Sequence, residues 1–573
     1  MCQEAPSRPT AVSSSSLAAV TAQGDQVVVP GHPFLPIPWQ QRGDRIGLAD
    51  IPLMRYLGLD LQDTPVAGQQ PVLWFAAEPE ALPTWYDNGH RYLDMTDWAD
   101  EQNWSLRPVG NELQLQFPLP FGRIEAGRRA QQSWGDRLVL EVNEPVPWVL
   151  EETANEFTLQ VQAYLDFEAD ALTSAPGNLL ANLEVSVTKG SGTLIHGTFD
   201  QTARPRVWSL TNPDRIVIDI TQGDVVPRDI RWAPGIRWRD EYLTVGNRAF
   251  PVHQIHLEPE TAASLCPLWP NPEQMPGIAP LATTTRNWGA VAAINGGFFN
   301  RNNQLPLGAI RRDGQWISGP ILNRGAIAWN NQGQFLARRL FLTHVLTTAL
   351  EQRFTVKHIN SGYVEAGIGL YTPHWGTTYT PILDNEILVT VEQNRVVQQI
   401  PAGAAGSGAY PIPPTGALLV LRADSTAARA LAPGTAITLT PETRPVIFDG
   451  LPHALGGGPL LVQGGQVVLN AQAEGFSNAF VTQAAPRSAI GITQDGTVLL
   501  VAVHYSPGGR GPTLQETAQI MRQLGAQDAL NLDGGNSASL YLGGSLLNRH
   551  PDTVGRVHNG LGVFLPLEMA APE

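Results

Sequence analysis

The chain has 573 residues, of which 43% are hydrophobic and only 16% charged, so it is expected to fold, and it is long enough for two to four domains. Its formal net charge of −15 argues against a general nucleic-acid binder, because a phosphate backbone requires clustered Lys and Arg. A small anionic substrate stays possible, since a few arginines inside a cleft can outweigh the overall charge. The 56 Gly and 47 Pro between short apolar runs favour strands joined by turns, and we expect a multidomain, mostly β protein.

The first 30 residues are rich in Ser, Ala, Thr and Gln, which predicts a disordered tail. The sequence as given shows no signal peptide and no apolar run long enough to span a membrane. Cys2, followed by the serines at 13–16, is similar to the start of a mature lipoprotein, although a chance Cys in a floppy tail is the simpler interpretation. With only Cys2 and Cys266 in the chain, a disulfide framework is excluded and we do not expect a bridge.

Two modules are expected before the C-terminal part of the chain. Residues 31–135 are rich in Trp, Pro and polar turns and predict a small β-rich or α+β module without an evident function. In 136–240, the segments 136–141 and 214–219 share one pattern, an apolar strand between charged ends. With 206–215, this block resembles the AMIN family of small β-sandwich modules, which attach envelope proteins to peptidoglycan or other glycans. An ordinary antiparallel sheet explains the same pattern.

From 241 to 566, apolar strands end repeatedly in Gly-rich loops that carry Asn, Asp or Arg. Two loops share one pattern, because 291–299 and 529–537 each place a strand before Asn or Asp and a Gly-Gly pair. Before the second loop, Thr513 and Glu516 predict a capping box at the start of a helix. Glycines let backbone approach a ligand closely, so chemistry is expected on these loops.

Three further segments place glycines or an arginine near the start of a strand. The run 456–462 is a glycine loop before a strand, with backbone N–H groups that could bind an anion. Arg487 and Arg556 each stand near the start of a strand. A single arginine there is usually solvated, but two arginines aimed at one site would hold a phosphodiester by paired hydrogen bonds.

In order, the segments 291–299, 456–464, 487–491, 511–525 and 529–537 resemble the phosphodiester glycosidase family, which includes bacterial proteins associated with exopolysaccharides. The resemblance implies an α+β catalytic domain over 241–566. It implies that the catalytic residues are Asp533, Asn295, Arg487 and Arg556. The expected substrate contacts are Gly296, Gly297, Gly457, Gly458, Gly534, Gly535, Asn536, Ser537, His504 and Asn559. Asn536 and His504 depart from the family pattern, which puts the identity of the sugar in doubt more than the reaction.

The expected reaction is hydrolysis at the anomeric carbon of a sugar-1-phosphodiester in an envelope or exopolysaccharide glycan. The arginines would neutralise the phosphate, and Asp533 would act as base or nucleophile. A second carboxylate is sought among Asp313, Asp384 and Asp552 without a ranking. No zinc-ligand spacing or nucleotide-binding loop occurs, so no cofactor is expected, and a divalent cation stays open.

Other interpretations stay open. Ser537, His558 and Asp533 could form a triad, but the chain has no Gly-x-Ser-x-Gly elbow. A non-catalytic glycan-binding envelope protein is the main alternative, and a transferase in capsule assembly is another. The aromatic residues of 360–384 suit sugar stacking or loop packing equally. Since the family is usually exported, the resemblance implies a location outside the cytoplasm, in the periplasm or cell envelope.

Overall fold

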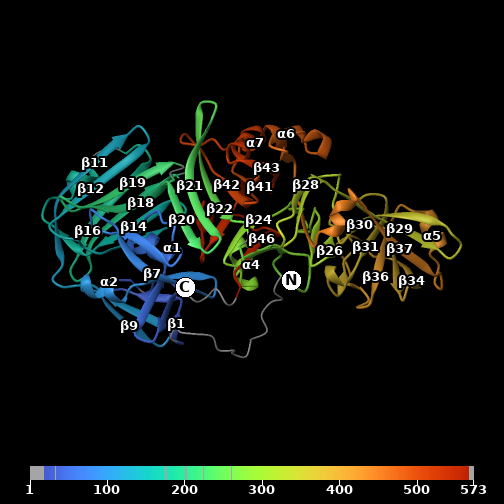
Figure 1. The fold of residues 1–573 in the computed structure, drawn as a ribbon, viewed down its shortest axis with the longest axis horizontal. Helices are drawn as coiled ribbons and strands as arrows, with labels where there is room; N and C mark the ends of the chain where they lie inside the picture. Colours follow the sequence, from blue (N-terminus) through green and yellow to red (C-terminus); the bar gives the residue numbers. More distant parts are fainter. Residues whose placement is uncertain are drawn as a thin grey trace.

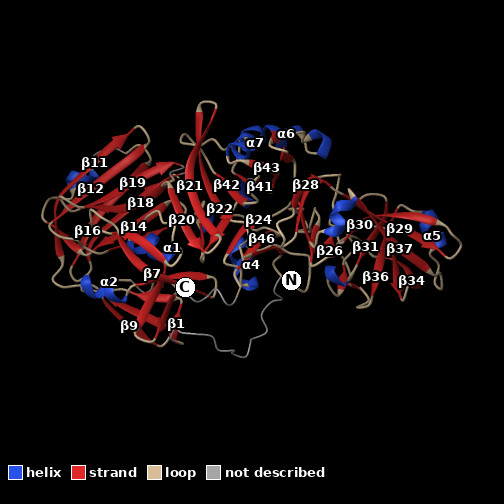
Figure 2. Ribbon diagram, viewed as in Figure 1, coloured by secondary structure: helices blue, strands red, loops and turns tan. Residues whose placement is uncertain are grey.

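The computed structural model describes residues 19–566, except 33, 175–176, 201–202, 223–224 and 260. The molecule is elongated, with residues 20–222 at one end, the sheets of the C-terminal domain in the middle and residues 341–444 at the other end (Figure 1). Strands dominate every part (Figure 2), which confirms the multidomain, mostly β fold class. None of the described helices is long and apolar enough to cross a membrane.

Residues 20–116 form the first module, in which two sheets carry two short helices. Its larger sheet has the order β1 (Val20–Gly24), β3 (Trp39–Arg42), β4 (Arg45–Ala49), β8 (His90–Asp94), β7 (Glu80–Asp87), β6 (Gln69–Leu73) and β5 (Asp60–Leu61). The smaller sheet has the order β2 (Gln26–Val28), β10 (Glu112–Gln116) and β9 (Ser105–Val109), and the helices are α1 (Asp50–Leu57) and α2 (Thr96–Glu101). The tail predicted for 1–30 is therefore wrong for 20–28, which form strands, whereas 1–18 lie outside the described residues.

Residues 122–222 form a sandwich of two antiparallel-rich sheets around one apolar core. One sheet has the order β15 (Ala163–Leu165), β11 (Gly122–Gln132), β12 (Gly135–Val142), β19 (Arg215–Gln222) and β18 (Ala203–Leu210). The other has the order β13 (Trp148–Glu152), β14 (Glu156–Val161), β17 (Gly192–Phe199) and β16 (Leu180–Thr188), and α3 (Asp170–Thr173) lies beside it. The predicted sandwich is confirmed, although it begins at β11 and not at 136. Its resemblance to the AMIN family stays a prediction.

The two similar segments of the sandwich turn out to be pairing partners. β12 and β19 run antiparallel, with Arg137 opposite Asp219 and Glu141 opposite Arg215. Arg137 donates to both carboxylate oxygens of Asp219, at 2.6 and 2.7 Å. The charged ends of each segment therefore face the opposite charge across the ladder, which fixes the register of the pair.

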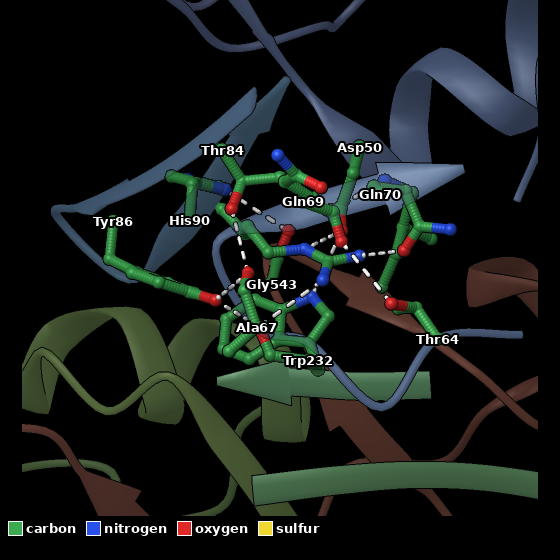
Figure 3. Close-up of polar contacts among 12 residues, drawn as sticks. Asp50, Thr64, Ala67, Gln69, Gln70, Thr84, Tyr86, His90, Trp232 and Gly543 are labelled. Atoms are coloured by element: carbon green, nitrogen blue, oxygen red, sulfur yellow. Dashed lines mark hydrogen bonds and ion pairs between the residues drawn. The ribbon is translucent and has the colours of Figure 1, made fainter. Parts of the chain in front are cut away.

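A buried polar network joins the first module to the C-terminal domain (Figure 3). The Arg91 guanidinium donates to Asp50 at 2.7 Å, and the Trp232 indole donates to the same carboxylate at 3.0 Å. Arg91 also donates to Gln70 at 2.7 Å, and both members of the ion pair are fully buried. Because removing one partner would leave a buried charge unpaired, this network holds α1 firmly against β20 (Arg228–Ala233).

The C-terminal domain begins with β20, at 228 and not at 241, because β20 is the first strand of its main sheet. That sheet has the order β20, β21 (Ile236–Val245), β22 (Arg248–Leu257), β42 (Val498–Val503), β41 (Arg487–Thr493), β43 (Ala526–Asn531), β39 (Leu460–Gln463) and β40 (Gln466–Val467). A second sheet has the order β23 (Ser264–Leu268), β46 (Gly560–Phe564), β24 (Ala292–Asn295), β44 (Leu540–Leu542) and β45 (Ser545–Leu546). A third has the order β26 (Gln315–Ser318), β25 (Ile310–Arg312), β38 (His453–Gly456), β27 (Gly325–Trp329) and β28 (Phe335–Arg339).

Helices connect these sheets. Outside the insert described below, the α-helices of the domain are α4 (Leu281–Trp288), α6 (Asn478–Thr482) and α7 (Leu514–Gln523). The short 3₁₀ helices of residues 228–566 are η1 (Pro373–Trp375), η2 (Val446–Gly450), η3 (Gln472–Glu474), η4 (Gly535–Ser537) and η5 (Pro551–Thr553). Cys266, buried in β23, is disulfide-bonded, which corrects the expectation that the chain carries no bridge. Cys2 lies outside the described residues.

A further sheet is inserted between β28 and β38 and projects from the domain (Figure 1). Its order is β34 (Arg395–Pro401), β33 (Ile387–Glu392), β36 (Gly416–Arg422), β31 (Gly367–Tyr371), β30 (Arg353–Ile359), β29 (Phe341–Thr348) and β37 (Ile437–Arg444). The insert also contains α5 (Ser425–Ala430) and the small pair β32 (Thr378–Tyr379) and β35 (Tyr410–Pro411). Tyr371, Trp375 and Tyr379 are buried here around the Arg422–Glu386 ion pair, so these aromatic residues pack the insert and do not offer a surface to a sugar.

Candidate active site

The glycine loops predicted from the sequence lie together at one edge of the main sheet. Arg487 at the start of β41 lies opposite Val503 at the end of β42, and Ala489 lies opposite Asn531 at the end of β43. Helix α7, which precedes β43, begins with the predicted capping box, in which Thr513 and Glu516 bond each other's backbone N–H. The helix and strand together deliver Asp533 to the sheet edge beside Arg487.

Asn295 connects the two loops that share a pattern. Its side-chain amide donates to the backbone carbonyl of Asp533 at 2.7 Å, and its side-chain oxygen accepts from the Ser488 hydroxyl at 2.6 Å and from the Ser539 N–H at 3.0 Å. Asn295 is fully buried, and both polar groups of its side chain bond to protein. These contacts give Asn295 a positioning role at the Asp533 loop, and the catalytic contact stays a prediction.

Asp533 is the carboxylate that these contacts place at the sheet edge. Its N–H donates to Gly296 O at 2.9 Å, and its Oδ1 accepts from the Gly534 N–H at 3.0 Å, so its backbone and one oxygen are fixed. The side chain is only partly exposed. Burial raises its pKa, while hydrogen bonds from Ser537 and Gly534 and the charges of Arg301 and Arg487 act to lower it.

Arg487 supplies a buried cation next to this carboxylate. The side chain is only 1% exposed, its Nη2 donates to Gln483 O at 2.6 Å, and its guanidinium lies 5.1 Å from the centre of the Phe480 ring. Its Nε is buried and has no hydrogen-bond partner among the described residues. Burial lowers the pKa of Arg487 to about 10, and the charge of Asp533 acts in the opposite direction. An anion would satisfy both the charge and the unpaired donor.

A cluster of aromatic rings that the sequence did not predict lies beside Arg487. Phe298, Phe476 and Phe480 contact one another, with ring centres 4.9–5.8 Å apart. Arg324 lies 4.1 Å from the Phe476 ring centre, and its Nε has no partner among the described residues. Phe298 directly follows the Gly-Gly pair of the first loop, which was the one available signal. Phe476 and Arg324 lie far from Phe298 in the sequence, and no sequence pattern indicated that they would join it.

The glycines of the site are required mainly by packing. A Cβ would lie 2.1 Å from Asn559 Oδ1 at Gly296, 2.2 Å from Gly456 O at Gly297, 2.7 Å from Asn531 O at Gly457 and 2.9 Å from Pro486 O at Gly534. Gly458 and Gly535 adopt positive φ angles of 114° and 64°. These glycines allow close contact between strand ends, and direct contact with a substrate stays a prediction for each of them.

Of the remaining predicted residues, Asn559 serves the scaffold, since its Oδ1 accepts from the Gly297 N–H at 2.7 Å. Arg556 is exposed, and the adjacent Gly555 donates to Asn536 O at 2.6 Å, which places this segment beside the Asp533 loop. Arg556 makes no hydrogen bond or ion pair with any described residue, so its predicted role stays untested. His504 and Asn536 line a separate cavity, which Asp533 does not line.

The predicted second carboxylate is not found among our candidates at this edge. Asp384 accepts from Ala405 N in the inserted sheet, Asp313 lies in the turn between β25 and β26, and Asp552 is exposed beside His550. Glu474, which sequence reasoning missed, lies closer to the glycine loop, because a Cβ at Gly458 would meet its Oε2. Both Glu474 oxygens accept backbone N–H groups, from Gly325 and Leu460, so it holds the loop in place.

The alternative triad does not form. His558 is fully buried, its Nε2 lies 2.7 Å from Met275 O and its Nδ1 lies 3.2 Å from the Asn559 amide. Both ring nitrogens therefore bond to Met275 and Asn559, and neither bonds to Ser537 or Asp533. Within the described part of the chain, no group of three or more His, Cys, Asp or Glu side chains could hold a metal ion.

Residues 385–564 match the model of the phosphodiester glycosidase family. Over 107 residues the chain is 31% identical to N-acetylglucosamine-1-phosphodiester alpha-N-acetylglucosaminidase of Mus musculus and to that of Bos taurus. These alignments cover 17% of this chain and 21% and 20% of the two proteins, so the similarity spans about a fifth of each relative. The segment 385–564 that matches the family model contains Asp533 and Arg487, whereas Asn295 lies before it.

The whole fold has a solved counterpart. The crystal structure of a hypothetical protein from Synechocystis superposes with a TM-score of 0.85 at 40% sequence identity, over 95% of this chain and 99% of that chain. The modules before the family segment therefore recur together with it in that protein.

Proposed function

We propose that the C-terminal domain hydrolyses the bond between the anomeric carbon and the phosphate of a sugar-1-phosphodiester in an envelope or exopolysaccharide glycan. The family assignment of 385–564 supports the reaction class. The observation that carries the proposal is that Asp533, which is partly exposed, lies within electrostatic reach of the buried guanidinium of Arg487, whose Nε has no described partner. Such a pair can bind a phosphate diester and act on a water beside it.

The chemistry follows from these two groups. A water oxygen attacks the anomeric carbon while Asp533 accepts a proton from that water, and the bond from the carbon to the phosphate oxygen breaks. The leaving phosphate monoester carries the bonding electrons, and Arg487 stabilises the charge that grows on it. The leaving group is already a good anion, so it needs less protonation than an ordinary alcohol. With Asp533 as base, the product has the inverted anomeric configuration, and a retained configuration would assign it as nucleophile.

The test uses the methyl phosphodiester of N-acetylglucosamine 1-phosphate and measures the release of free sugar. The Asp533→Asn variant removes the base at almost constant volume, and we expect a loss of at least about 100-fold in rate. Asp44→Asn makes the same chemical change on an exposed turn of the first module and should leave the rate unchanged. A parental rate in Asp533→Asn would contradict the catalytic assignment. Binding of polysaccharide by the parent protein without sugar release would support the glycan-binding alternative.

In this proposal the enzyme acts outside the cytoplasm, and the sandwich of 122–222 contacts the glycan that the catalytic domain cleaves. The alignments with the relatives cover only 17% of this chain, so this placement rests on the type of substrate. Co-sedimentation of the full chain with purified peptidoglycan, compared with a chain that starts at 228, measures the contribution of the N-terminal modules. Equal sedimentation of both forms would contradict it.

A further inference from the structure

The cavity lined by His504 and Asn536 has a volume of about 630 Å³ and lies where the three parts of the molecule meet. Its wall is formed by α1 of the first module, by β18 of the sandwich and by segment 547–553 of the C-terminal domain. Neither Asp533 nor Arg487 lines it. Its volume lies within the range of about 300–1,000 Å³ that small-molecule sites occupy. Because the Arg91–Asp50 network fixes α1 against β20 (Figure 3), this wall is part of the rigid fold.

The cavity contains more positive charge than its carboxylates balance. The arginines in its wall are Arg55, Arg204, Arg206, Arg228 and Arg549. Arg228 pairs with Asp60 at 2.8 Å, but none of the other four lies within 4 Å of a carboxylate of the described residues. Two of the remaining acids in the wall lie next to histidines, Asp240 at 3.0 Å from His253 and Asp552 at 3.5 Å from His550. The other four guanidinium groups therefore face three carboxylates, those of Glu152, Asp240 and Asp552.

The unpaired arginines bond only to backbone carbonyls or to other neutral or basic groups. Arg55 donates to Leu546 O, Arg204 donates to Ala154 O at 3.2 Å, and Arg549 donates to Asn536 O at 3.1 Å. The Nε of Arg549 has no partner among the described residues. Burial lowers the pKa of all three side chains, while the charges of Glu152 and Asp240 act to raise that of Arg55 and the charges of Glu152 and Asp552 act to raise that of Arg204. The cavity therefore has five arginines against four carboxylates, and the Nε of Arg549 is a spare N–H donor.

Aromatic side chains lie among these arginines. Trp208, Trp238 and Tyr505 line the same cavity, and the Arg206 guanidinium lies 5.2 Å from the Trp208 ring centre. Flat apolar rings next to planar donors match a ligand that has both C–H faces and acidic groups, which is the chemistry of an acidic sugar. We propose that this cavity binds a short acidic saccharide, whose carboxylate or phosphate is held by Arg55, Arg204 and Arg549. This site is independent of the reaction assigned to Asp533.

Titration calorimetry on the full chain tests the site with three saccharide probes. Trigalacturonate carries carboxylates, glucose 6-phosphate carries a phosphate, and maltotriose is neutral. We expect at least one acidic probe to bind, and maltotriose to bind at least about tenfold more weakly. Arg204→Gln should weaken binding of the acidic probe about tenfold or more, since a charge-assisted hydrogen bond to the ligand is lost. The acidic probe that binds better identifies the acid.

Two further variants keep the result interpretable. Arg206→Ala removes a guanidinium whose one described contact is the Trp208 ring, so it should fold normally and still weaken binding. Arg128→Ala removes an exposed arginine of the same sandwich outside the cavity and should bind like the parent. Arg487→Gln should also bind like the parent, because its site is separate. Parental affinity in both Arg204→Gln and Arg206→Ala, absence of binding by both acidic probes, or equally tight binding of inorganic phosphate or maltotriose would overturn the proposal.

Discussion

The side-chain amide of Asn295 donates a 2.7 Å hydrogen bond to the backbone carbonyl of Asp533, 238 residues further along the chain. In the opposite direction, the Asp533 N–H donates to Gly296 O at 2.9 Å. The two strand–Gly-Gly loops are therefore bonded to each other at the residues that correspond in their shared pattern. Asn295 lies outside the segment that matches the family model, so the Asp533 loop is held by a residue that this segment does not contain.

We predict that Asn295→Ala lowers kcat of the proposed reaction by at least about tenfold with little change in KM. The substitution leaves the Asp533 carbonyl, the Ser488 hydroxyl and the Ser539 N–H without their partner, and each unsatisfied buried group costs about 1–3 kcal/mol. Folding stability should fall as well, but a purely structural residue would not change kcat in the protein that remains folded. Steady-state kinetics and thermal unfolding on the same preparation separate the two effects.

Two variants control this prediction. Ser488→Ala removes one of the two donors to the Asn295 oxygen and should produce a smaller loss in the same direction. Asn182→Ala, on the exposed face of the sandwich, should change neither kcat nor stability by more than experimental error. A parental kcat in Asn295→Ala would show that the hydrogen bond does not position Asp533.

Arg487→Gln should shift the acidic limb of the pH–rate profile toward higher pH. The positive charge of Arg487 acts to lower the pKa of Asp533, so its removal raises that pKa, and a higher pH is needed to ionise the base. The rate at the optimum should also fall, by about 100-fold or more, because a group that stabilises the developing phosphate charge is lost. Profiles of kcat/KM against pH measure both effects. Arg128→Gln, on the surface of the sandwich, should reproduce the parental profile, and a limb that stays or moves to lower pH in Arg487→Gln would contradict the assignment.

Local patterns predicted much of this structure. The capping box at Thr513, the strands before the glycine loops and the sandwich all depend on neighbouring residues, and each is present. Domain boundaries were less accurate, because β11 and β20 belong to sheets whose other strands come later in the chain. Sequence periodicity reports that a strand is half buried, but it does not report which sheet the strand joins.

The candidate site shows the same limit. Asp533 and Arg487 were found because each lies within a recognisable loop, and the sheet register brings them together. Glu474 and Arg324 were missed, since their roles arise only from contacts across the fold, with Gly325 N and with the Phe476 ring. For a related reason, the sequence did not predict the hydrogen bond from Asn295 to the Asp533 loop. A polar residue at a strand end looks the same in sequence whether it faces a substrate or another loop.

Gly297→Ala should disrupt the site through packing. A Cβ there would lie 2.2 Å from the Gly456 carbonyl oxygen, a backbone atom that cannot rotate away, so the two strand ends must separate. We expect a loss of about 1–3 kcal/mol in unfolding free energy, as for other overpacked positions, with a lower kcat. Chemical denaturation and kinetics measure both. Gly68→Ala has open space around the added methyl and an ordinary backbone, so it should be neutral. Equal stability of the two variants would argue against close contact between these loops.

Stability should fall at acidic pH through the buried His558. Burial lowers its pKa to about 4, against about 6.5 for an exposed histidine, so the unfolded chain binds a proton at this residue before the folded chain does. The contribution of neutral His558 to the unfolding free energy is therefore fully present above pH 6.5. It is lost progressively as the pH falls to about 4, and it changes little below that. The full difference is roughly 3 kcal/mol at about 1.4 kcal/mol per pKa unit.

His256 and His453, whose pKa values burial also lowers to about 4, act in the same direction, so His558→Gln should flatten only part of the slope. Unfolding free energies from urea titrations at pH 4, 5, 6 and 7 measure that slope, and His196→Gln, at a partly exposed position of the sandwich, should retain the parental dependence. An identical slope in His558→Gln and the parent would show that His558 is not held neutral by burial.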